Sequence, residues 1–395
     1  MKTILFVYHA SNIGGGTYCL LNILKEIDRT KYQPKVLLCT DGDLVKEIKC
    51  LGIEVYFMSS MTLVPYNKSL WNWRVLRNYR RIKNAFSDFE RILDEINPDA
   101  VYLNTMMLAP YLEVAKKKGI KTAIHLREHW PLDEHIRQLS KIQTTISTYA
   151  DQIVAINGYS ASMIPNREAT IVYDWIDLSN RFEKRPFDEI FGMDSSKLKV
   201  YLFTGGLQDI KGAAEVVEVF TNYIKGDNKR LLMVGVDPEP NYNGLKNKIR
   251  YYLAKTGLYY VYEYRVRRMI DLDKRIARIP ATYKLKHIME QAYCNISFFT
   301  IPHANLALAE NIIVGTVPVA ARTEESIEYS HGGDLALLFE LGSQEDMVKK
   351  LDYLDANYET IKAKLASERH FVADQFNRER NSAVLDGVYE RLFQN

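Results

Sequence analysis

Short continuous runs of apolar residues alternate with longer stretches of helical periodicity along most of the chain. In the first half, the runs that predict β-strands lie at 3–9, 35–40, 53–58, 100–104, 122–126, 152–156 and 170–173. Helical patterns separate most of them, as where Leu20, Leu21, Leu24 and Ile27 share a face after the first run. Continuous apolar strands joined by helices indicate βαβ units in a parallel sheet covered on both faces.

A second series of the same kind begins near Leu198. Its predicted strands lie at 200–203, 231–236, 259–264, 296–300, 317–320 and 335–339. Each series opens with a strand, a glycine-rich turn and a helix, which predicts two doubly wound domains. The stretch 165–196 has prolines, many charges and no long periodic pattern, so it is the predicted hinge. The last segment, 378–393, predicts an amphipathic helix.

Composition narrows the class of protein. The 395 residues are 47% hydrophobic and 26% charged, which provides for two substantial cores in a soluble chain. A net charge of +3 is too small to favour a nucleic-acid partner. The four cysteines form no CxxC pair and no metal-ligand spacing, so we expect free thiols in a reducing cytoplasm. The chain has no run of about 18 apolar residues, so we expect no membrane-spanning helix.

The first candidate site is the glycine-rich turn after the opening strand, Asn12-Ile13-Gly14-Gly15-Gly16-Thr17. Glycines let the backbone approach a ligand closely, and the N-terminus of the following helix attracts an anion. A tight turn that binds nothing is the alternative. The spacing is not GxGxxG, which argues against a dinucleotide-binding oxidoreductase.

Two further candidates lie in the second half. Lys211 follows Gly205 and Gly206 at the predicted start of a helix, where it can neutralise a diphosphate. Glu310 lies near the start of another helix, where a carboxylate can accept hydrogen bonds from a ribose. The alternative for both is a side chain that is simply solvated.

A fourth candidate, 123–130, follows a strand and places polar groups at a carboxyl edge, where open α/β sheets bind ligands. His125, Glu128 and His129 there can orient hydroxyl groups. A zinc site is disfavoured because the i, i+4 histidine pair begins in a strand rather than in a helix.

The segment 68–86 is basic and aromatic and has no acidic residue. We expect Leu70, Trp73, Leu76 and Phe86 to share a helical face. Such a helix can lie on an anionic membrane surface. The favoured alternative is an ordinary helix that packs on the sheet.

The order and separation of these motifs resemble the retaining GT-B glycosyltransferases of glycosyltransferase family four over nearly the whole chain. His125 is similar to a histidine of that family near the transferred sugar. The string Ile171-Val172-Tyr173-Asp174-Trp175-Ile176-Asp177 resembles the family's interdomain passage Val-Ile-Tyr-Asn-Gly-Ile-Asp. Lys211 with Gly212, and Glu310, match the family's diphosphate and ribose positions.

The resemblance implies a GT-B fold with an acceptor domain at 1–175, completed by a helix at 377–395, and a donor domain at 176–376. It implies that Lys211 and the amides of Leu306 and Ala307 hold the diphosphate, that Glu310 holds the ribose and that His125 orients the sugar. It implies that the remaining donor contacts come from Gly14, Gly15, Gly16, Gly205, Gly206, His303 and Asn305.

The resemblance further implies transfer with retention of configuration, with no bound metal and no cofactor beyond the nucleotide-diphosphate-sugar co-substrate. The expected acceptor is a glycan or a polyprenyl-linked sugar in capsule or lipopolysaccharide synthesis. The expected location is cytoplasmic, with peripheral contact to the inner membrane surface through 68–86.

Three positions depart from the family pattern: Thr17 replaces a glutamate, Gly206 an arginine, and Pro302 the first of two glutamates. These changes are explained by an unusual donor, or by replacement of the absent side chains with His303, Asn305 or the arginines of 241–282. A non-catalytic GT-B subunit that binds a glycan or a partner enzyme is the main alternative function. A nucleotide-sugar epimerase is a weaker one, and a dehydrogenase is disfavoured.

Overall fold

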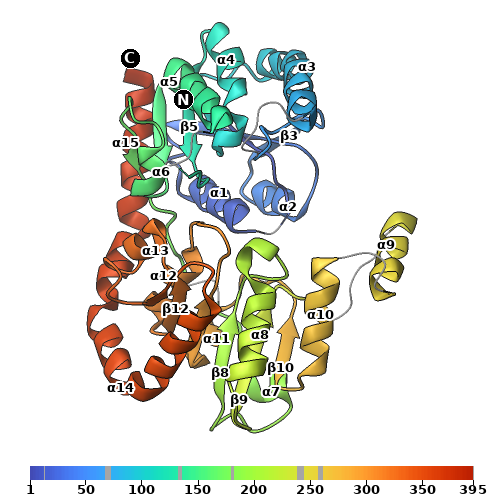
Figure 1. Cartoon of the computed structure of the whole chain (residues 1–395). Helices are drawn as coiled ribbons and strands as arrows, with labels where there is room; N and C mark the ends of the chain where they lie inside the picture. The colour runs from blue at the N-terminus through green and yellow to red at the C-terminus, as the bar shows by residue number, and fades with distance from the viewer. Residues whose placement is uncertain are drawn as a thin grey trace. The chain divides into compact units, whose positions relative to one another are not determined.

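The computed structural model describes residues 1–12, 14–66, 73–131, 136–178, 182–237, 244–256 and 261–394. The chain divides into two compact units (Figure 1). Unit 1 comprises Met1–Trp175 and Phe376–Asn395, and unit 2 comprises Ile176–Gln375. Each unit is built on a parallel sheet flanked by helices, which confirms the predicted doubly wound architecture.

The sheet of unit 1 has seven described strands in the order β3-β2-β1-β4-β5-β6-β7. They are β1 (Lys2–Tyr8), β2 (Tyr32–Leu38), β3 (Glu54–Phe57), β4 (Ala100–Leu103), β5 (Lys121–Leu126), β6 (Gln152–Ala155) and β7 (Thr170–Ile171). Because β1 pairs with both β2 and β4, the direction of winding reverses between β1 and β4. Ligands of such sheets bind at the carboxyl ends of the strands beside this reversal.

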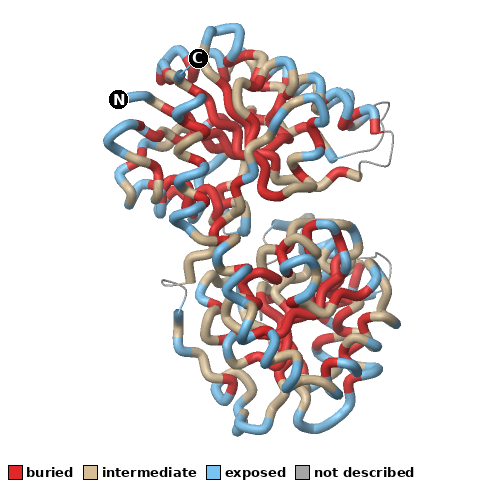
Figure 2. The backbone as a smooth tube through the Cα atoms, turned by 90° about the vertical axis from the view of Figure 1, so that its left-hand side faces the viewer, coloured by how far each residue is buried: buried red, intermediate tan, exposed pale blue. Residues whose placement is uncertain are grey.

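Helices cover both faces of this sheet. They are α1 (Gly15–Glu26), α2 (Asp43–Cys50), α3 (Trp73–Ile96), η1 (Met106–Leu108), α4 (Pro110–Lys117), α5 (Arg137–Tyr149), α6 (Gly158–Ser162) and α15 (Arg378–Gln394). Residues of α1, α2 and α15 form one hydrophobic core with the sheet, and residues of α3, α4 and α5 form another. Figure 2 shows the buried backbone concentrated along the strands that these cores enclose.

The sheet of unit 2 has six described strands in the order β10-β9-β8-β11-β12-β13. They are β8 (Lys199–Phe203), β9 (Lys229–Val234), β10 (Ile276–Ile279), β11 (Cys294–Ser297), β12 (Val317–Ala321) and β13 (Leu337–Phe339). Since β8 pairs with both β9 and β11, the reversal lies between β8 and β11.

The described helices of unit 2 are α7 (Phe187–Phe191), η2 (Asp209–Lys211), α8 (Ala213–Tyr223), α9 (Leu245–Lys255), α10 (Tyr262–Leu272), α11 (Lys286–Gln291), α12 (Leu306–Val314), α13 (Glu324–Tyr329) and α14 (Gln344–Gln375). The long helix α14 is interrupted at Asn357, whose φ of −125° is not helical. None of the helices in the described part of either unit is long and apolar enough to cross a membrane.

The strand predicted at 259–264 is wrong. Residues 257–260 lie outside the described ranges, and α10 begins at Tyr262. Tyrosine and valine favour strands, but Val266 and Ile270 are buried four residues apart, so tertiary burial selects the helix. The strand at this edge of the sheet is β10, whose sequence Ile-Ala-Arg-Ile is too short and too polar to stand out.

The apolar face predicted for 68–86 is also wrong in part. Residues 67–72 lie outside the described ranges, and α3 begins at Trp73. Trp73 and Leu76 are 62% and 54% exposed, whereas Ile82, Phe89 and other residues farther along α3 are buried in the core. The C-terminal part of α3 therefore packs on the sheet and its first turn does not.

Candidate functional site

In unit 2, the turn after β8 is shaped by a close approach of two backbone segments. Gly206 has a φ of +64° and donates its N–H to the carbonyl of Val234 at 3.1 Å. A Cβ at this position would lie 3.2 Å from the carbonyl oxygen of Gly235. A left-handed backbone and so little space disfavour any side chain. The backbone at position 206 therefore disfavours the arginine that stands there in the family that the sequence resembles.

Lys211, at the end of η2, provides a cation beside this turn. Its Nζ lies 4.4 Å from the centre of the Phe299 ring. Burial lowers the pKa of Lys211 to about 8. No carboxylate pairs with Nζ in the part of the chain that the structure describes. The amine is thus placed to meet an external anion.

The loop after β11 brings further predicted residues to the same edge. The N–H of Thr300 donates to the carbonyl of Ile210 at 3.1 Å, which joins this loop to η2. Phe299 has a φ of +44°, which is uncommon for a bulky residue. Its ring contacts His303, with centroids 5.7 Å apart. Lys211 and His303 are therefore brought together around one strained aromatic residue.

The N-terminus of α12 follows directly. The side chain of Asn305 accepts a hydrogen bond from the N–H of Leu308 at 3.3 Å and so caps the helix. Its amide nitrogen is buried and has no hydrogen-bond partner among the described residues. The first N–H groups of a helix, here those of Leu306 and Ala307, have no intrahelical acceptor. Glu310 lies one turn further on and is 6% exposed.

The arginines that were candidates to replace the missing one are mostly engaged elsewhere. Arg265 pairs with Glu218, and Arg275 pairs with Asp273. Arg267 is buried, where it donates to the carbonyl of Asp237 at 2.6 Å and pairs with Glu263.

In unit 1, the glycine turn precedes α1 at the reversal point. Gly14 is the N-cap of α1 and supplies no side-chain hydrogen bond. Thr17 is 2% exposed, and its hydroxyl donates to the carbonyls of Asn12 and Gly14 at 2.9 and 2.7 Å. Position 17, which is a glutamate in the family that the sequence resembles, therefore holds a hydroxyl that closes its own turn. A Cβ on Gly16 would overlap the hydroxyl of Tyr8.

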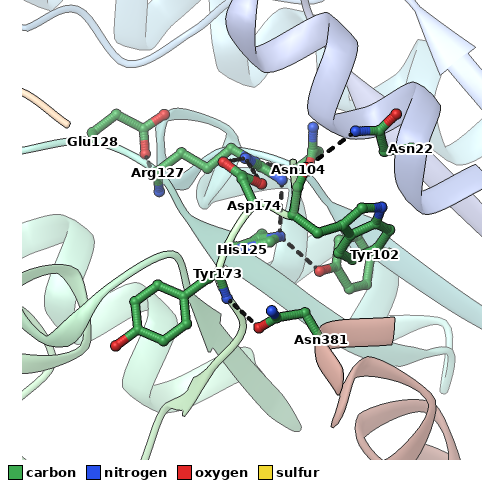
Figure 3. A network of polar contacts seen from close by, with 10 residues as sticks. Asn22, Tyr102, Asn104, His125, Arg127, Glu128, Tyr173, Asp174 and Asn381 are labelled. Atoms are coloured by element: carbon green, nitrogen blue, oxygen red, sulfur yellow. Dashed lines mark hydrogen bonds and ion pairs between the residues drawn. The ribbon is translucent and has the colours of Figure 1, made fainter. Parts of the chain in front are cut away.

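His125 lies at the end of β5 and is completely buried. Its Nδ1 lies 2.8 Å from the hydroxyl of Tyr102 and 3.3 Å from Nη2 of Arg127 (Figure 3). Arginine has only donors, so Nδ1 accepts and the ring hydrogen is on Nε2. Burial, with Arg127 close by, lowers the pKa of His125 well below its ordinary value. The ring is therefore neutral, and its Nε2 has no partner within the described ranges.

Arg127 is the centre of this network. Its Nη1 lies 2.7 Å from each carboxylate oxygen of Asp174, and its Nε donates to Oδ1 of Asn104 at 3.0 Å. Burial opposes the charge on Arg127, but the interactions with its neighbours, with Asp174 foremost, together raise the pKa. The sequence did not indicate this pair, because its members lie 47 positions apart and belong to the ends of different strands.

The loop after β5 is held rigidly beyond Arg127. The carboxylate of Glu128 accepts hydrogen bonds from the hydroxyl of Thr105 and from the N–H of Met106, the latter at 3.0 Å. Burial raises the pKa of Glu128 despite these donors. The ring of His129 stacks on Tyr159 at 4.1 Å. No group of three or more metal-ligating side chains occurs in the described chain.

Comparison with known proteins identifies the fold. No protein-family model and no curated protein sequence matches the chain. HepE of Anabaena, in complex with UDP and glucose, matches with a TM-score of 0.75 and 14% identity over 99% of this chain and 100% of that chain. A glycosyltransferase from Rickettsia africae matches with a TM-score of 0.72 and 16% identity over 100% and 99%. Sucrose-phosphate synthase from Thermosynechococcus elongatus matches with a TM-score of 0.70 and 11% identity over 100% of both chains.

Identities this low establish the fold and nothing finer. The two sheets of seven and six strands, with the C-terminal helix α15, are those of the GT-B architecture. The predicted fold class is therefore confirmed.

Proposed function

We propose that this protein is a glycosyltransferase that moves a sugar from a nucleoside-diphosphate sugar to an acceptor hydroxyl. The observation that carries the proposal is Lys211, an amine without a carboxylate partner in the described chain at the carboxyl edge of a GT-B sheet. The HepE structures contain UDP, glucose and UDP-glucose, which supports a nucleotide sugar as the first donor to test.

The chemistry assigned to the site follows from its charges. In the transfer, the acceptor oxygen bonds to the anomeric carbon as the bond from that carbon to the diphosphate breaks. The leaving diphosphate takes the bonding electrons. Lys211 and the N–H groups of Leu306 and Ala307 stabilise this charge. Glu310 accepts hydrogen bonds from the ribose, and Nε2–H of His125 orients the donor sugar.

The proposal also includes retention of configuration and independence of a metal ion. It assigns the remaining donor contacts to Gly14, Gly15, Gly16, Gly205, Gly206, His303 and Asn305. They rest on the resemblance to glycosyltransferase family four. The amide nitrogen of Asn305, which has no hydrogen-bond partner among the residues that the structure describes, supports a polar contact to the donor where the family's first glutamate is absent.

The acceptor is proposed to be a glycan or a polyprenyl-linked sugar of cell-surface polysaccharide synthesis, used at the cytoplasmic membrane face. The first turns of α3 support a membrane contact. Trp73 and Leu76 are exposed, the guanidinium of Arg77 lies 4.6 Å from the Trp73 ring centre, and Arg80 and Arg81 are exposed beside them. Such a surface suits anionic headgroups. Co-sedimentation with anionic liposomes, lost when the three arginines are changed to glutamine, tests it.

The function is tested by a thermal-shift screen of UDP, GDP, ADP, CMP and their sugar conjugates on wild type and Lys211→Ala. A ligand of the folded state raises the melting temperature. Stabilisation of wild type alone by one nucleotide, followed by transfer of its sugar to an acceptor glycan, is the expected result. Binding without turnover favours the non-catalytic subunit, and a new sugar nucleotide formed from donor alone favours the epimerase.

A further inference from the structure

We propose that Arg127, held by Asp174, is a positioning residue that fixes the tautomer of His125 and joins this histidine to the segment where the chain leaves unit 1. The inference rests on the proposed function for its effect on turnover. Its structural half, the tautomer of His125, stands on the geometry alone.

The tautomer depends on Arg127 because the other neighbour of Nδ1 leaves it undetermined. The hydroxyl of Tyr102, 2.8 Å away, can either donate to Nδ1 or accept from it. The guanidinium of Arg127, 3.3 Å away, can only donate. With Arg127 in place, Nδ1 must accept and the hydrogen is confined to Nε2. That nitrogen is then a donor, buried and unpartnered among the described residues.

The orientation of Arg127 is in turn fixed from two sides. Asp174 accepts at 2.7 Å through both oxygens, and Asn104 accepts from Nε at 3.0 Å. The side chains of Arg127 and Asp174 are 9% and 15% exposed, so both charges lose most of their hydration. A buried pair of this kind contributes little net stability compared with apolar residues of the same volume. The planar arrangement of donors on the guanidinium of Arg127, by contrast, cannot be reproduced by lysine.

Contacts next to Asp174 hold the two segments of unit 1 at which the chain leaves this unit and returns to it. Asp174 adjoins Trp175, whose carbonyl accepts from Asn22 at 3.4 Å. The N–H of Tyr173 donates to Asn381 of α15 at 3.0 Å. The ring of Tyr173 also contacts that of Phe376, the residue at which the chain returns to unit 1, with centroids 5.4 Å apart. The departing segment, the returning segment and His125 therefore belong to one network (Figure 3).

Position 174 makes this network particular to the chain. The interdomain passage that the sequence resembles has asparagine there, whereas Asp174 supplies a full negative charge opposite Arg127. An asparagine could accept only through its single oxygen and would leave a buried guanidinium without a counter-charge.

The test combines ¹⁵N NMR of the histidine rings with UDP affinity and the hydrolysis rate of UDP-glucose. Loss of one of the eight histidine signals in His125→Gln identifies His125. Wild type is expected to show hydrogen on Nε2 alone, and Tyr102→Phe the same, because Arg127 remains. The double variant Arg127→Met/Asp174→Asn removes both charges together. It is expected to populate both tautomers and to hydrolyse UDP-glucose about 100-fold more slowly, with unchanged UDP affinity.

The proposal is overturned if the double variant melts as wild type does and keeps either the single tautomer or the wild-type rate. Should that variant not fold, Arg127→Lys replaces it with the same expectations, because its single nitrogen pairs with Asp174 and leaves no second donor to reach His125. If wild type neither binds UDP nor hydrolyses UDP-glucose, UDP-glucose is not the donor, and the rate arm is repeated with the nucleotide sugar that the thermal-shift screen finds; if that screen finds none, the proposed function fails. The NMR arm then still decides whether Arg127 sets the tautomer.

Discussion

With UDP-glucose as the proposed donor, raising the pH from 7 to 9 should weaken its binding to this protein by about tenfold. Burial lowers the pKa of Lys211 to about 8. The protonated fraction of the free amine then falls from about 0.9 at pH 7 to about 0.09 at pH 9. If the diphosphate binds only the ammonium form, Kd rises by the same factor, which is about 1.4 kcal/mol.

Unfolding does not account for this loss of affinity. The native pKa of Lys211 lies below the unfolded value of 10.5, so the unfolded chain holds more protons between pH 8 and 10.5. The contribution of Lys211 to the free energy of unfolding therefore rises across that window. Lys211 does not destabilise the ligand-free protein as the pH goes from 7 to 9.

Isothermal titration calorimetry at pH 7, 8 and 9 measures the effect. UDP-glucose is preferred to UDP because its esterified diphosphate does not titrate in this range. Lys211→Arg keeps the charge at every pH, so its Kd should not vary. Lys211→Met should bind weakly at all three values. The reasoning is refuted if wild type shows no change in Kd, or if Lys211→Met keeps the wild-type change.

The other predictions concern stability. Gly206→Arg, which introduces the residue of the family that the sequence resembles, should lower the free energy of unfolding by about 1–2 kcal/mol because φ at this position is +64°. In chemical denaturation, Gly206→Ala should be destabilised by the same amount. Equal stability of wild type and both variants would contradict this prediction. Gly15→Ala should stabilise the fold by about 0.5 kcal/mol, since the added Cβ meets nothing within 4 Å. Gly16→Ala should destabilise the fold, because its Cβ would overlap the hydroxyl of Tyr8. Equal melting temperatures of the two variants would disprove this contrast. Because burial raises the pKa of Glu128 above its unfolded value, ionised Glu128 costs stability at pH 7. Glu128→Gln should then melt no lower than wild type at pH 7, with any advantage shrinking towards about pH 4.5; a variant that melts well below wild type at pH 7 would show that the carboxylate is needed for the fold.

The strands of both sheets could be predicted because parallel strands that are buried on two faces have continuous apolar sequences. The exception, 259–264, shows the limit of this signal. Tyr262 and Val266 have strand-forming side chains, but the burial of Val266 and Ile270 at helical spacing in α10 is a tertiary property. The true edge strand β10 is too short to show a pattern of its own.

The candidate site, too, could be predicted only where it depends on local sequence spacing. Local spacing placed Lys211 beside a glycine turn, and the structure puts it with Phe299 and His303 at one sheet edge. It could not reveal the ion pair of Arg127 with Asp174, which depends on β5 and β7 ending at the same edge. Nor could it show that His125 is wholly buried, which decides its charge and its tautomer.

The two candidate edges are built on different physical principles, and this difference makes them separable by mutation. In unit 2 the geometry of the candidate edge comes from backbone: the left-handed turn at Gly206 and the N-terminus of α12 both follow strands that end at the edge carrying Lys211. In unit 1 it comes from side chains that fix one another, with Arg127 at the centre. Changes in the first should therefore appear as lost nucleotide affinity. Changes in the second should leave nucleotide affinity intact and appear in the rate of the chemical step, because only there does the orientation of His125 matter.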